Sequence, residues 1–161
     1  MVGSGTALTD PASMYNYAIR RLLERVTWYV RDQGGETAIT FAHVKRFPYA
    51  KLRDYLTILQ LQPTTIVWDR IKSVKIDQPN RVRLLQVADL AAGCLYSAMN
   101  ADDYGDYEPS YLLELAPRIY VRGAGHVKSY GMNVVGPPEH MDATYPWWPE
   151  LVQACRPGAR V

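Results

Sequence analysis

The residues of this sequence that could support metal or acid–base chemistry are carboxylates set among apolar residues. Gln86 and Asp89 lie three positions apart, which makes them neighbours on one face of a helix. A carboxylate buried in such a stretch must be paired, hydrogen-bonded or bound to a metal, because an isolated buried charge is costly. Asp89 is therefore a candidate metal ligand or acid–base residue that Gln86 orients. The alternative interpretation is that both side chains satisfy a neighbouring backbone or helix end.

Two further aspartates are candidates for the same site. Asp69 follows the predicted strand 64–68, and sites in parallel sheets lie beyond the carboxyl ends of strands. Asp77 lies in the turn before the helix that carries Asp89. Asp89, Gln86 and Asp69 form the predicted catalytic set, and Asp89, Asp69 and Asp77 the predicted ligands of Mg²⁺ or Mn²⁺. Both Asp69 and Asp77 also have an ordinary role open to them as turn or helix-capping residues.

A local basic cluster follows the first predicted strand. His43, Lys45 and Arg46 could hold the phosphates of a nucleic acid, or they could simply be a solvated helix entry. The whole chain has 18 Lys+Arg against 16 Asp+Glu, a net charge of +2, so it has no global basic field. Its two cysteines are too few for a disulfide scaffold or a four-ligand zinc site, and they indicate reduced thiols in a cytoplasmic protein.

The order of predicted elements indicates an α/β fold. Asp10 and Pro11 begin a helix over 11–33, which has apolar residues on one face and charged residues, including Arg20, Arg21 and Glu24, on the other. Strands are expected at 37–44 and 64–68, with 71–76 either continuing the second strand or forming a third, and a helix begins after Pro48. A nearly all-apolar helix over 81–100, buried on most sides, completes a small, mostly parallel sheet flanked by helices.

The length of 161 residues is typical of a single domain. We expect a flexible arm over 1–9, an α/β body over 10–137 and an irregular tail over 138–161, which is rich in Trp and Pro and ordered only if its aromatics dock. No window approaches the roughly 18 apolar residues of a membrane span, and the N-terminal segment does not resemble a signal peptide. A cytoplasmic protein without a membrane partner is therefore expected.

The segment Leu84–Gly93 (LLQVADLAAG) resembles the signature "LQ-x-AD-x-x-AG" of the bacterial and phage family called domain of unknown function 3800. Gln86 and Asp89 stand at its Gln and Asp positions, and the resemblance extends over about Tyr15 to Pro137. It implies a partial RNase H-like fold with an acidic site that binds divalent metal. The N-terminal strand of that family, which carries an Asp-Glu-Ser motif, has no counterpart in this sequence.

In an RNase H-like sheet the missing strand would pair with the strand at 37–44. Without it we expect an open edge there, covered by a second copy, by a partner chain or by the Trp-rich tail. Three functions follow. The preferred prediction is a non-catalytic oligomeric or assembly component. The alternatives are a metal-dependent nuclease or phosphodiesterase with Asp89 as ligand, and a nucleic-acid-binding module.

Overall fold

The computed structural model describes residues 10–44, 47–122, 127, 130–134 and 139–156. It divides the chain into two compact units, Met1–Leu85 and Gln86–Val161, and each is described by itself. The boundary falls inside a continuous helix, so no change in composition marks it. No helix among the described residues is long and apolar enough to cross a membrane.

The first unit opens with the long helix α1 (Pro11–Asp32), very close to its predicted range. Asp10 is the N-cap, and its carboxylate accepts a hydrogen bond of 2.8 Å from the Ser13 N–H. Pro11 suits the first turn because its missing N–H would have had no partner in the helix. After the helix ends, Gly34 adopts a φ of +69°, a left-handed conformation that side chains disfavour.

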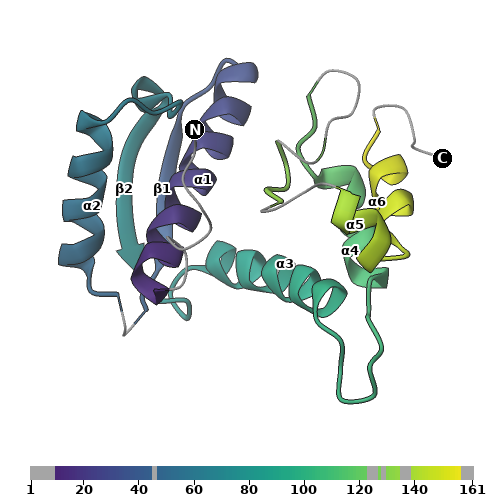
Figure 1. The fold of residues 1–161 in the computed structure, drawn as a ribbon. Coiled ribbons are helices and arrows are strands. Elements are labelled where there is room, and N and C mark those ends of the chain that lie inside the picture. Colours follow the sequence, from purple (N-terminus) through teal and green to yellow (C-terminus); the bar gives the residue numbers. More distant parts are fainter. Residues whose placement is uncertain (1–9, 45–46, 123–126, 128–129, 135–138, 157–161) are drawn as a thin grey trace. The chain divides into compact units, whose positions relative to one another are not determined.

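A βαβ unit follows, and it confirms the mixed α/β class. Strand β1 (Thr37–Ala42), helix α2 (Tyr49–Leu61), the 3-10 turn η1 (Trp68–Arg70) and strand β2 (Ile71–Asp77) come in this order. The two strands form a parallel two-stranded sheet, in which Ile39 pairs with Val74 and Phe41 with Ile76 (Figure 1).

One face of this sheet carries the core of the first unit. Ile39 is buried there, and Phe41, Val74 and Ile76 pack against the same cluster. The helices α1 and α2 and the segment after α2 complete the cluster with Ile19, Leu23, Leu52, Leu59 and Ile66. On the alternate positions Ala38, Ser73 and Lys75 are exposed, so the two faces of the sheet differ sharply.

The predicted strand at 64–68 is wrong, because the second strand begins only at Ile71. Side chains of α1 take the hydrogen bonds that a strand partner would have taken. The Trp28 Nε1–H donates to the Thr65 carbonyl over 2.8 Å, and the Val67 N–H donates to Thr27 Oγ1 over 3.1 Å. The backbone is thereby satisfied without a sheet neighbour.

The second unit is helical. It contains most of α3 (Arg83–Met99), then α4 (Ser110–Leu115), the turn η2 (Ala116–Arg118), α5 (Glu139–Thr144) and α6 (Trp148–Ala154). Its core consists of small and apolar residues around a fully buried tryptophan: Ala98, Leu112, Ala116, Val127, Met141, Trp147, Trp148, Leu151 and Cys155.

The structure differs from the sequence-based expectation in the C-terminal segment, where α5 and α6 occupy a region expected to be irregular. Both helices are too short for apolar periodicity to reveal them. Trp148 and Leu151 are 0% exposed, so packing rather than helix propensity holds this segment.

Candidate functional site

The carboxyl ends of β1 and β2 bring together two of the predicted site residues, His43 and Asp77. The His43 N–H donates to the Asp77 carbonyl over 2.9 Å, directly beyond the register pair Ala42 and Asp77. The Asp77 carboxylate accepts the N–H of Gln78 over 2.7 Å, which fixes the turn. The two residues therefore meet through their backbones at the carboxyl ends of the strands, which is where sites of parallel sheets lie. Lys45 and Arg46 lie outside the described residues.

Asp69 does not share this edge, which corrects its predicted position. It belongs to η1, ahead of β2, whereas Asp77 is the last residue of β2. At roughly 3.3 Å per strand residue, the two carboxylates are separated by about 20 Å. A two-metal centre holds its ions about 3.5–4 Å apart, so this pair cannot form one. Asp69 instead lies 3.4 Å from Arg70, and its side chain is 72% exposed.

Gln86 and Asp89 occupy neighbouring turns of α3, as the sequence predicted, but both are exposed. The expectation that this helix is buried on most sides is wrong for the described residues. Leu84, Val87 and Leu90 are 77%, 60% and 70% exposed. The spacing establishes an apolar helix, but burial also requires a neighbouring element to cover it, and the spacing does not specify one. Asp89 therefore does not carry the penalty of an isolated buried charge.

Among the described residues, no group of three or more His, Cys, Asp or Glu side chains is close enough to hold a metal ion. The predicted ligands are distributed between separate places. Asp69 lies before β2, Asp77 lies at its end, and Asp89 belongs to the second unit.

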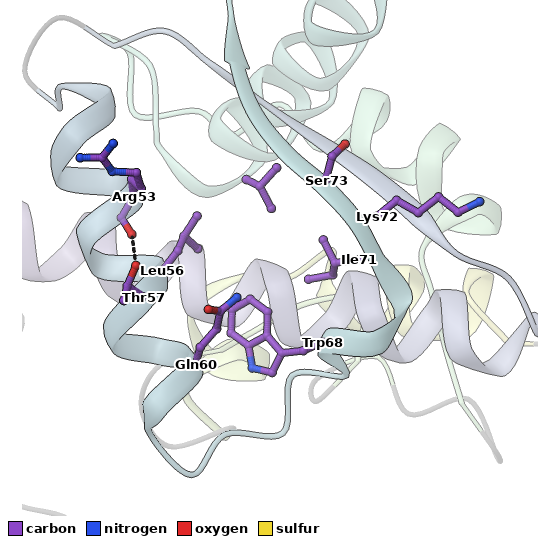
Figure 2. A pocket seen from close by; sticks show the side chains of 9 residues that line it. Arg53, Leu56, Thr57, Gln60, Trp68, Ile71, Lys72 and Ser73 are labelled. Carbon is purple, nitrogen blue, oxygen red and sulfur yellow. Dashed lines mark hydrogen bonds between the residues drawn. The ribbon is translucent and has the colours of Figure 1, made fainter.

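A pocket that the sequence analysis missed lies between α2 and β2. Figure 2 shows Arg53, Leu56 and Gln60 of α2 on one side of it, and Trp68 and Ile71 on the other. Its volume is about 310 Å³, and Thr57, Lys72, Ser73 and Val74 complete the lining. The only sequence pattern that could have indicated this pocket is a run of polar residues on one side of the predicted second helix. The same pattern is equally typical of a solvated helix face.

Both cations of this pocket are already engaged. Lys72 Nζ lies 2.7 Å from the Glu36 carboxylate, and Arg53 Nε lies 3.8 Å from Asp54. Hydrogen bonding to Lys72 lowers the pKa of Glu36, and the same contact raises the pKa of Lys72. The pocket therefore offers an aromatic wall and polar groups, with its positive charge partly neutralised.

A second feature missed from sequence is a charged cluster on α1. Glu24 was expected on the solvated face, yet it is 1% exposed. Its two oxygens accept hydrogen bonds from Arg20 Nε over 3.2 Å and from Arg21 Nη1 over 2.9 Å. Burial opposes the charge on Arg21, but hydrogen bonds to Tyr17 and Glu24 outweigh it and raise the pKa of Arg21. This cluster is satisfied internally, and we assign it to the stability of the first unit.

We compared the chain with known protein families, curated proteins and solved structures. The chain matches no protein-family model, no curated protein and no solved structure.

Proposed function

We propose that this chain is a non-catalytic assembly component of RNase H-like type, which associates by adding a strand from a second copy to the outer edge of β1. One observation carries the proposal. In the part of the chain that the structure describes, β1 is hydrogen-bonded to β2 and has no strand along its other edge. Alternate residues of a strand turn their backbone N–H and C=O groups to each side, so this edge offers a ready template for pairing.

The two edges of the sheet differ in the features that prevent pairing. β2 carries Lys72 and Lys75, and lysines on an edge strand disfavour the approach of another strand. β1 reads TAITFA and contains no charged residue and no proline. Thr37, Ile39 and Thr40 are β-branched, which favours an extended strand. The β2 strand thus carries residues that disfavour the pairing of another strand, and the β1 strand carries none.

The distribution of carboxylates supports a non-catalytic role. Asp69 precedes β2 and Asp77 ends it, so the described residues of the first unit do not bring these two carboxylates into the acidic cluster that two-metal phosphodiester chemistry uses. The family resemblance therefore supports the RNase H-like fold in this proposal, and not a metal-dependent activity.

The proposal is tested with two lysine substitutions at one register pair. Ala38 and Ser73 face each other across the sheet and are both exposed, so neither substitution disturbs the core. We expect Ala38→Lys to weaken association by about tenfold or more in sedimentation velocity, because a lysine on an edge strand disfavours the approach of another strand. Ser73→Lys, on the edge already protected by lysines, is the matched control and leaves association unchanged.

Association that is equally insensitive to both substitutions contradicts pairing at the β1 edge. A monomeric wild-type chain at all accessible concentrations contradicts the assembly role altogether. Addition of EDTA is expected to leave the midpoint of thermal unfolding of the assembly unchanged, because no metal holds it together.

The position of Asp77 at the carboxyl end of β2, where sites of parallel sheets lie, favours one second candidate, a metal-dependent nuclease. Titration of Mn²⁺ by calorimetry separates the two functions. The assembly role predicts no binding that depends on Asp77. Saturable binding in the wild-type chain that is lost in Asp77→Asn would favour the nuclease and justify assays with labelled RNA and DNA.

A further inference from the structure

The second unit contains an apolar groove alongside the C-terminal half of α3. Two adjoining hollows of about 240 and 370 Å³ share Leu95, Gly131 and Met132 as lining residues. Most of the remaining lining is also apolar: Ala91, Met99, Leu112, Leu115, Ile119, Val134 and Met141. We call these two hollows the α3 groove. Apolar hollows of this kind are typical of docking sites for apolar side chains.

Gly131, which lines both hollows, lies close against residues 119 and 120. A Cβ at this position would overlap the side chain of Ile119 and the carbonyl oxygen of Tyr120. The chain therefore passes closely over residues 119–120, and any side chain at 131 would force the segments apart. The shape of the groove is thus fixed by the local backbone.

The side chains that fit such a groove are exposed on the N-terminal half of the same helix. Leu84, Ala88, Ala91 and Leu95 recur at spacings of four, three and four, which places them on one stripe of α3. Leu84 is 77% exposed and the adjacent Val87 is 60% exposed. α3 therefore carries protruding apolar side chains in its first half and borders the groove in its second half.

Charges of opposite sign flank the two ends of α3. Arg81 and Arg83 stand at its start, and an acidic loop over 101–108 follows its end. Within the loop, the Asp102 carboxylate accepts N–H groups over 2.8 and 3.0 Å, and the Glu108 carboxylate caps Ser110, so both have structural roles. The exposed carboxylates of Asp103 and Asp106 make no hydrogen bond or ion pair within the described residues.

We infer that a second copy of this chain docks on the α3 groove, with the two α3 helices antiparallel and each inserting its N-terminal half into the other copy's groove. A two-fold axis between Ala91 and Ala92 sets Leu84 opposite Met99 and Ala88 opposite Leu95, so large side chains face small or recessed ones. The same arrangement brings the start of each α3, with Arg81 and Arg83, toward the acidic loop that follows the end of the other copy's α3. Arginine meets carboxylate at both ends, and small residues cross at the centre.

This inference rests on the proposed assembly function, but it concerns a different surface. The β1 edge and the α3 groove would both be interfaces between identical copies. Two such interfaces give a closed tetramer or a longer chain of copies, whereas either one alone gives a dimer. The failure of one interface can therefore be observed separately from the failure of the other.

The first test removes an inserted side chain. We expect Leu84→Glu to weaken pairing through α3 by about a hundredfold, since each copy loses a buried leucine, and to reduce the wild-type assembly to dimers in sedimentation velocity. Leu61→Glu is the matched control. Leu61 is a leucine near a helix end that is 83% exposed, and its substitution is expected to leave the assembly unchanged.

The second test exchanges the flanking charges. Arg81→Glu/Arg83→Glu and Asp103→Lys/Asp106→Lys should each weaken α3 pairing by about tenfold or more, because like charges meet at both ends. An equimolar mixture of the two variants should pair again, since each end then joins opposite charges. If the two helices were parallel, arginines would meet arginines and carboxylates would meet carboxylates in the wild-type pair, which would then be repulsive. Weaker pairing in each variant than in the wild type, with pairing restored in the mixture, therefore identifies the antiparallel arrangement.

Each outcome decides between the two interfaces. Dimers from Leu84→Glu that become monomers on adding Ala38→Lys support both. An assembly unaffected by Leu84→Glu and by the charge exchange overturns the α3 inference and leaves the β1 proposal standing. A monomer from Leu84→Glu alone overturns the β1 proposal and retains the α3 inference. A wild-type monomer overturns both, and indicates that residues of the same copy cover the groove.

Discussion

Glu24 is a charged residue that is buried although its helical spacing predicts an exposed position. Its neighbours in sequence are arginines, and helical spacing predicts a solvated face for all of them. In the structure the carboxylate lies buried and bridges Arg20 and Arg21, whose side chains remain 36% and 38% exposed. The arginines keep contact with water while their charge compensates the buried oxygens. Burial of the acid is thereby tolerated at modest cost.

Replacing Glu24 by Gln should destabilise the first unit. The substitution keeps the volume but removes the charge to which both arginines donate, and hydrogen bonds to a charged group contribute about 1.5–3 kcal/mol each before the partial exposure of the arginines is counted. We expect a loss of about 2 kcal/mol in the free energy of unfolding, measured by urea denaturation.

Glu36→Gln is the control for that measurement. Glu36 also pairs with a cation, Lys72, but the two side chains are 48% and 66% exposed. Exposed ion pairs contribute little to stability, so the midpoint of unfolding should not change measurably. Equal losses for the two substitutions would show that the burial of Glu24 has no energetic consequence.

At the scale of elements, the boundaries of α1 follow from local chemistry alone. Asp10 and Pro11 begin the helix, and the glycines at 34 and 35 follow its end, so the predicted range agrees closely with the structure. The cap is also sensitive to pH. The hydrogen bond from the Ser13 N–H lowers the pKa of Asp10, with a smaller contribution from the Ala12 N–H.

The start of α1 should therefore fray in acid. The pKa of Asp10 is lower in the folded chain than in the unfolded chain. The cap therefore stabilises the start of the helix fully above the unfolded-state pKa, and this stabilisation is lost as the pH falls through the folded-state pKa. We expect faster exchange of the Ser13 amide with solvent, relative to its intrinsic rate, as Asp10 becomes protonated. In Asp10→Asn, which keeps a capping oxygen that does not titrate, this protection should be independent of pH.

The helix α3 and the second strand show where element prediction stops. The spacing of apolar residues established α3 nearly to its ends, yet it could not reveal whether another element covers Leu84 or Val87. The stretch 64–68 has the composition of a strand, but Thr27 and Trp28 of α1 satisfy its backbone instead. Strand formation requires a partner, and no local pattern specifies one.

At the scale of the whole molecule, the two compact units should respond separately to core substitutions. Leu52 belongs to the core of the first unit and Leu151 to that of the second, and both are almost completely buried. We expect Leu52→Ala to cost about 2–5 kcal/mol and to accelerate hydrogen exchange mainly over residues 19–77. Leu151→Ala should act mainly over 98–155. Equal acceleration throughout both ranges in either variant would show that the units unfold together.

By itself, the sequence determined the α/β class, the first strand, the ends of α1 and the position of Gln86 and Asp89 on one helical face. Each of these depends on contacts within a few residues or on periodicity, and such information is carried locally. Only the tertiary structure decided that Glu24 is buried, that Asp89 is exposed and that Asp69 and Asp77 lie at opposite ends of β2. Burial and the meeting of distant side chains depend on which elements pack together, and that packing depends on surfaces far apart in the chain.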